Sequence, residues 1–61
     1  MESEIKELFL LLKSEINAVN EYEAAIKKIK SEKVIKRLEE IRDDEKEHIR
    51  EISSLILNSD N

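Results

Sequence analysis

Apolar residues recur at intervals of three and four along almost the whole chain, a pattern typical of amphipathic helices rather than of strands. The first run of such positions is Ile5, Leu8, Leu12, Glu15, Val19, Tyr22, Ile26 and Ile29. The same register would next place Lys33 and Lys36 on the apolar face, so it must shift there. The shifted run is Val34, Leu38, Ile41, Glu45, His48, Ile52 and Leu55. The pattern predicts two helices, at about residues 3–30 and 32–57, with a break near Lys30 to Lys33.

The residues around this break favour a turn. Ser31 can cap the second helix with its hydroxyl, and Glu32 complements the positive end of that helix's dipole. Three lysines, at positions 27, 28 and 30, suit the carboxyl end of the first helix. Because no glycine or proline breaks the chain, a single helix of more than about fifty residues with a coiled-coil stutter is the alternative. The polar tail at residues 58–61 is expected to fray.

Each helix carries an apolar face wider than one neighbouring helix can cover. The flanking apolar residues are Phe9, Leu11, Ile16, Ala18, Ala25, Ile35, Ile49 and Ile56. A chain of 61 residues also buries too little surface to make a self-sufficient core. The predicted fold is therefore all-α: a single domain, residues 1–61, forming a two-helix antiparallel hairpin that dimerises into a ferritin-like four-helix bundle. Leu10 and Leu57 fall on the outer side of their helices, which favours assembly beyond the dimer.

Composition narrows the classes of partner and site. The chain contains no cysteine, so disulfides and thiolate metal sites are excluded. It carries 15 acidic and 11 basic residues, a net charge of −4, with the basic residues interspersed among acids, so nucleic acid is not an expected partner. The longest apolar run, residues 8–12, is too short to span a bilayer, and acidic residues precede it. We expect a cytoplasmic protein without a membrane partner.

Three ionisable residues interrupt the apolar faces: Glu15, Glu45 and His48. Taken singly, a core glutamate can set helix register and a core histidine is usually a satisfied structural residue. Glu15 and Glu45 are equally far from a turn at residue 30, however, and His48 follows Glu45 by one helical turn. A two-fold dimer would gather four carboxylates and two imidazoles, a donor set that suits two iron or manganese ions better than a structural zinc.

These residues also lie in segments that resemble a known family. The run from Glu15 through Ala18 to Tyr22 is similar to the Glu-x-x-Ala-x-x-x-Tyr motif of rubrerythrin-like ferritin relatives, and Asp44 to His48 resembles their second-helix motif. Carboxylate di-iron bundles pair such a glutamate with Glu-x-x-His. The one-hairpin format resembles half-ferritins, or encapsulated ferritins, in which two chains share each di-iron centre.

The resemblance implies a ferroxidase that oxidises Fe(II) to Fe(III) with dioxygen or peroxide and serves iron storage or transfer. Glu15, Glu45 and His48 would be the catalytic residues and metal ligands, with two irons per dimer and manganese or zinc as substitutes. Tyr22 would donate a hydrogen bond to a liganding glutamate, and Asp44 would accept one from an imidazole on a neighbouring helix.

Some family features have no counterpart in this sequence. Ser14 and Asn17 replace the extra acidic entry-site residues, and the cysteines of rubrerythrin's electron-transfer module are missing. An encapsulin shell is a possible partner by this resemblance, but no cargo peptide is recognised after the second helix, so the sequence does not support it. The alternative function is a non-catalytic helical-hairpin interaction module whose polar core layer sets register.

Overall fold

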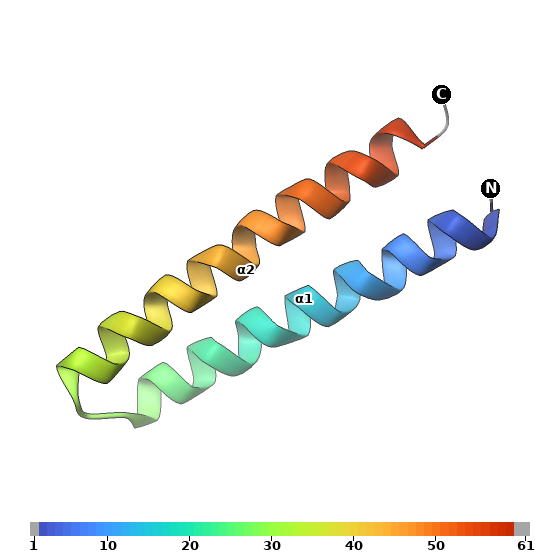
Figure 1. The fold of residues 1–61 in the computed structure, drawn as a ribbon. Helices are drawn as coiled ribbons and strands as arrows, with labels where there is room; N and C mark the ends of the chain where they lie inside the picture. The colour runs from blue at the N-terminus through green and yellow to red at the C-terminus, as the bar shows by residue number, and fades with distance from the viewer. Residues whose placement is uncertain (1, 60–61) are drawn as a thin grey trace.

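The protein is a hairpin of two antiparallel helices (Figure 1). The computed structural model describes residues 2–59, in which α1 spans Glu2–Lys28 and α2 spans Glu32–Asn58. The two helices lie side by side along their full length, and the hairpin measures 46 × 14 × 10 Å. The all-helical hairpin predicted from the apolar pattern is confirmed, with α1 ending two residues earlier than expected.

The turn is built by Ser31, as predicted. Its backbone is extended (φ −71°, ψ 116°), and its hydroxyl accepts a hydrogen bond from the backbone N–H of Val34 at 3.3 Å. The last backbone hydrogen bond of α1 runs from the N–H of Ile29 to the carbonyl of Ala25. Because the chain reverses here, the alternative of one continuous helix is wrong.

The carboxyl end of α2 is ordered further than the sequence indicated. Asn58 is helical, and Ser59 caps the helix by donating from its N–H and its hydroxyl to the carbonyl of Ile56, at 3.2 and 2.8 Å. The rest of the tail predicted to fray, residues 60–61, lies outside the described residues.

Little of the apolar surface is buried by the hairpin itself. Among residues 3–59, Val19 is the one buried residue, and 8% of its surface remains exposed. Several large apolar side chains stay exposed: Phe9, Leu10, Leu11, Ile16, Val34, Leu55 and Leu57. The outward positions of Leu10 and Leu57 are as predicted. Two helices therefore give the fold its shape but leave apolar faces uncovered.

The prediction of which α2 residues face α1 is wrong along one edge of the helix. Val34 and Leu55 are 44% and 57% exposed, whereas Ile35 and Ile56, expected only to flank the contact, are partly buried. The apolar arc of α2 is wider than one helix can cover, and α1 packs against its Ile35 side. The uncovered side includes His48, which is more exposed than an inner position would be.

We call this uncovered side the open face. Its residues recur at heptad intervals, which keeps them on one side of each helix. They are Leu11, Ala18 and Ala25 on α1, and Val34, Ile41, His48 and Leu55 on α2. Ala18, Ala25 and Ile41 are partly buried, and the other four are exposed.

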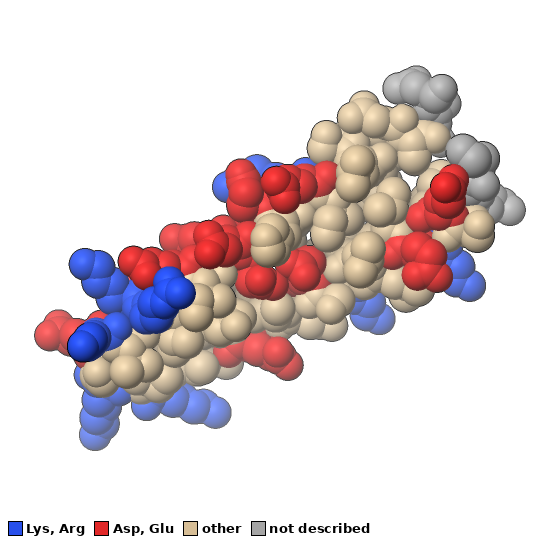
Figure 2. Space-filling view, viewed as in Figure 1, with Lys and Arg blue, Asp and Glu red and all other residues tan. Residues whose placement is uncertain are grey.

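Charge is distributed unevenly along the hairpin. Residues 27–38 hold six basic residues and one acidic residue, a net charge of +5 at the turn. The rest of the chain holds fourteen acidic and five basic residues, a net charge of −9. Figure 2 shows lysine and arginine gathered at the turn, with carboxylates along the middle and toward the other end. The expected mixing of charges thus holds along the helices but not around the turn.

No helix within residues 2–59 combines the length and apolar character needed to cross a membrane.

Candidate metal centre

The two helices bring the three predicted ligands together halfway along the hairpin. Glu15 is the middle residue of α1 and Glu45 the middle residue of α2. His48 lies one turn beyond Glu45 on the same side of α2. The prediction that these three residues lie at one level is confirmed, because they form a group of potential ligand atoms all within 4.8 Å of one another.

The imidazole links the two carboxylates. Its Nδ1–H donates a hydrogen bond to Oε1 of Glu15 at 3.0 Å, across the gap between the helices. The same nitrogen lies 3.6 Å from Oε1 of Glu45, on its own helix. The side chains of Glu15 and Glu45 are 25% and 21% exposed, against 51% for His48. The carboxylates therefore lie between the helices, while the imidazole lies toward the open face.

The pKa values of two of these groups reflect their crowding. Partial burial and the neighbouring carboxyl of Glu15 raise the pKa of Glu45 above its ordinary value, and His48 opposes this rise. The hydrogen bond to Glu15 raises the pKa of His48, against a smaller lowering by partial burial. Without a cation, both groups hold a proton more tightly than usual. A divalent metal ion would supply positive charge in place of those two protons.

The donor set fits a metal ion with oxygen and nitrogen preference. Opposite ligands of an octahedral ion with bonds of about 2.1 Å are about 4.2 Å apart, so the cluster needs only a small contraction to bind one. Two carboxylates and one imidazole suit iron or manganese. Three protein ligands leave positions open, so one hairpin does not by itself enclose the ion.

Tyr22 lies next to this cluster. It is partly buried and lines a hollow of about 310 Å³ together with Ala18, Glu21, Ala25, Leu38 and Glu45. The hollow opens between the two helices on the turn side of the ligands. Tyr22 and Glu45 line the same hollow, which is consistent with the predicted hydrogen bond from Tyr22 to a liganding glutamate. That hydrogen bond stays a prediction.

Asp44 is exposed, and its charge contributes to the raised pKa of Glu45. Nδ1 of His48 is hydrogen-bonded to Glu15, so Nε2 is the nitrogen left for a further acceptor. The predicted partner of Asp44 is an imidazole of another hairpin, so this role also stays a prediction.

Glu21 is a carboxylate near the site that the sequence reasoning did not select. It shares the hollow with Tyr22 and Glu45. The sequence did place Glu21 directly before Tyr22 and one helical turn after Ala18, which could have indicated that it lies near the site. Its exposed side chain fell outside the apolar register and so looked like ordinary surface charge.

Comparison with known proteins gave no match to a family model, to a curated protein or to a solved structure.

Proposed function

We propose that two hairpins pair through their open faces and bind two Fe(II) ions, which they oxidise to Fe(III). The observation that carries the proposal is the convergence of Glu15, Glu45 and His48, from two helices, within 4.8 Å. Isolated surface acids need no such arrangement. Here two partly buried carboxylates and an exposed imidazole lie at one level of the hairpin, where two chains could bring four carboxylates and two imidazoles together.

The pairing completes the donor set. One hairpin offers three ligands and leaves the imidazole side uncovered, whereas the second hairpin would cover that side with apolar residues and its own ligands. Four carboxylates in one layer repel one another, so two divalent cations would stabilise the paired form. In this arrangement Glu15 and Glu45 hold the metal ions and His48 completes each set, with Tyr22 and Asp44 orienting the ligands.

Iron is the substrate in this reaction. Two Fe(II) ions give up two electrons to one dioxygen, which takes up two protons and leaves as hydrogen peroxide. Carboxylates suit this work, because they accommodate the change in charge and bond length between Fe(II) and Fe(III).

The direct test is native mass spectrometry of the protein loaded with Fe(II) without oxygen. We expect an even-numbered oligomer with about two irons per dimer, and no bound iron in Glu45→Ala. Glu47→Ala is the matched control, because Glu47 lies on the same helix, is exposed and pairs with Arg50 instead. Admission of air should then consume dioxygen and produce Fe(III) in the parent and in the control only.

Two results would count against the proposal. If the parent retained no iron, the cluster would not be an iron site. If iron were bound but no dioxygen were consumed, the centre would be a non-catalytic metal site, which manganese or zinc could also occupy.

A second candidate function is a metal-free interaction module, and one observation favours it. The imidazole of His48 already has a hydrogen-bond partner on the other helix, the carboxyl of Glu15. A polar layer of this kind can fix the register of an oligomer. The triple variant Glu15→Gln, Glu45→Gln, His48→Leu would then keep its oligomeric state and lose no activity.

A further inference from the structure

Basic side chains gather at the turn of the hairpin. Residues 27–38 carry a net charge of +5, whereas the rest of the chain carries −9. The basic residues of this segment, here called the basic turn, are Lys27, Lys28, Lys30, Lys33, Lys36 and Arg37. All six are exposed, and Figure 2 shows lysine and arginine surrounding this end of the hairpin. The hairpin is therefore strongly polarised along its 46 Å length, although its net charge is negative.

The lysines of the basic turn have no ionic partner in the hairpin. Arg37 pairs with Glu40 at 3.0 Å, but none of the five lysines forms an ion pair within the described residues 3–59. None of the six basic residues belongs to the open face, so the proposed pairing of two hairpins leaves them exposed. Like charges gathered at one end repel one another, and an anionic partner would relieve that repulsion.

We propose that the basic turn docks end-on against an anionic membrane surface, with the long axis of the hairpin pointing away from the lipid. The partner is the layer of negatively charged lipid headgroups, and the hairpin lies on this layer without crossing it. The inference goes beyond the proposed function and does not depend on a metal ion. It revises the expectation of no membrane partner, which considered only segments that could span a bilayer.

The placement of the lysines favours a flat partner. Lys28 follows the buried Val19 by nine residues, about two and a half helical turns, so it lies on the outer side of α1. Lys36 precedes the partly buried Glu45 by nine residues, so it lies on the outer side of α2 by the same reasoning. These two charges therefore lie on opposite sides of the hairpin. A linear polyanion along one side would reach only one of them, whereas a plane across the turn attracts both.

All six charges are close enough to the turn to be attracted by one plane. Arg37, the furthest along α2, is six residues from Ser31, or about 9 Å at a rise of about 1.5 Å per residue. This distance is about one Debye length at about 0.1 M salt. Lysine also carries its charge on a long flexible stem. The whole basic turn can therefore contribute to binding.

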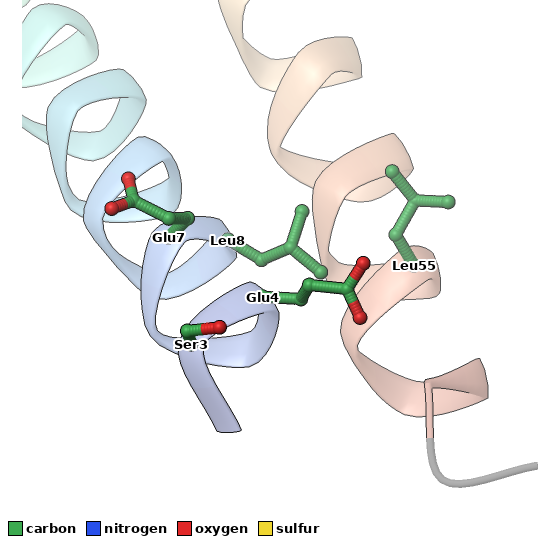
Figure 3. Close-up of a pocket in the computed structure, with 5 residues that line it drawn as sticks. All are labelled: Ser3, Glu4, Glu7, Leu8 and Leu55. Atoms are coloured by element: carbon green, nitrogen blue, oxygen red, sulfur yellow. The ribbon is translucent and has the colours of Figure 1, made fainter. Parts of the chain in front are cut away.

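The other end of the hairpin is acidic and would be repelled by the same surface. There Glu4 and Glu7 line a hollow of about 520 Å³, and Figure 3 shows Glu4 extending from α1 toward α2. Glu4 is 27 residues from Ser31, about 40 Å along the helix and several Debye lengths away. Its carboxylate therefore does not cancel the attraction at the turn. This polarity determines which end of the hairpin docks.

Nucleic acid fits the basic turn less well than a membrane does. The major groove of DNA admits one α-helix, whereas the turn presents two helices side by side. Residues 27–38 contain no aromatic side chain on which a base could stack. Five of the six basic residues are lysines, which lack the forked geometry with which arginine recognises bases.

The test is co-sedimentation of the whole chain with lipid vesicles. Phosphatidylcholine vesicles with about 30% phosphatidylserine are compared with pure phosphatidylcholine vesicles at about 0.1 M salt. We expect binding to the anionic vesicles only. At about 1 M salt, where the Debye length falls to about 3 Å, this binding should be lost. No binding to the anionic vesicles, or equal binding to both kinds, would overturn the inference.

A pair of matched variants tests the location of the charge. Lys28→Gln with Lys36→Gln should lower the partition coefficient by roughly 20- to 30-fold, since each lysine near an anionic surface contributes about five-fold. Lys6→Gln with Lys13→Gln changes the net charge equally at exposed positions away from the turn, so it should bind as the parent does. Equal losses in both variants would mean that net charge, and not the basic turn, drives binding.

Fluorescence quenching tests the end-on orientation. The chain has no cysteine, so a fluorophore can be placed on Ala24→Cys near the turn or on Ser3→Cys at the other end, both exposed positions. Lipids with a quencher on the headgroup should quench the label at residue 24 more strongly. Equal quenching at the two positions would overturn the end-on arrangement.

Two competition experiments test the choice of partner. Tighter binding to a DNA duplex or to single-stranded DNA than to the anionic vesicles, at the same salt, would replace the membrane by nucleic acid. Release from the vesicles by inorganic phosphate at constant ionic strength would mean that the turn binds single phosphate ions, and this too would overturn the inference. We expect neither result.

Discussion

Nδ1 of His48 lies 3.0 Å from Oε1 of Glu15, a contact between residues 33 positions apart in the chain. The ion pairs of Arg37 with Glu40 and of Arg50 with Glu47 are local, one helical turn apart and exposed, and such pairs add little stability. The contact of His48 with Glu15 is different, because it joins the two helices where the carboxylates are partly buried. The stability and metal binding of the site should therefore depend on whether His48 is protonated.

Metal-free stability should fall as pH rises. The pKa of Glu45 is raised above 4.5 and that of His48 above 6.5, so the folded state binds both protons more tightly than the unfolded state. The contribution of Glu45 is lost as pH rises through its raised pKa, and that of His48 as pH rises beyond 6.5. We expect the Tm of metal-free protein to be higher near pH 5 than near pH 8.

The variant Glu15→Gln separates this effect from the general charge of the chain. Partial burial, the largest cause of the raised pKa of Glu45, remains in this variant, but the Glu15 carboxyl that also raises the pKa values of Glu45 and His48 is removed, so the pH dependence should become shallower. Glu47→Gln changes the net charge equally but leaves the cluster intact, so its slope should match the parent. Equal slopes in all three proteins would disprove the role of the cluster.

Metal binding should release protons. A metal ion bound by Glu45 and His48 displaces the protons that these groups hold, because ligands coordinate in their deprotonated forms. Calorimetric titration with Mn(II) near pH 6.5, in two buffers of different ionisation enthalpy, should show proton release that decreases toward pH 8. His48→Gln should release fewer protons, and identical heats in the two buffers would contradict ligation by these groups.

The turn should depend on the hydroxyl of Ser31. Ser31→Ala removes the acceptor for the N–H of Val34 and should cost about 1 kcal/mol, a fall in Tm of roughly 4–8 °C. Ser31→Asp keeps an acceptor and should retain most of the stability. Ser14→Ala, an exposed position in the middle of α1, is the control and should change Tm little. Comparable losses in both alanine variants would show that the cap contributes nothing specific.

The sequence was sufficient for the helices, the Ser31 cap and the common level of Glu15 and Glu45, because these follow from local periodicity and from distance to the turn. It did not reveal which side of α2 faces α1. Val34 and Ile35 are both apolar neighbours on a broad arc, and periodicity cannot choose between them when each helix has more than one neighbour to satisfy. The exposure of His48 follows from that same rotation of α2.

The charge of the turn was also missed, for a related reason. Lysines in the last turn of one helix and the first turns of the next were each explained locally, by helix dipoles and solvated faces. Only the reversal of the chain at Ser31 brings them together at one end of the hairpin.

The hairpin should be most sensitive to substitution at Val19. Val19 is buried between the helices, and Val19→Ala removes two methyl groups, which should cost about 2 kcal/mol in the free energy of unfolding. Leu10→Ala removes more apolar surface but from an exposed outward position, so it should change stability by less than about 0.5 kcal/mol. Urea denaturation at matched protein concentrations measures both. A large loss in Leu10→Ala, growing with protein concentration, would mean that Leu10 is covered in an assembly larger than the dimer. A small loss in Val19→Ala would mean that the contact between α1 and α2 contributes little and that stability comes from pairing alone.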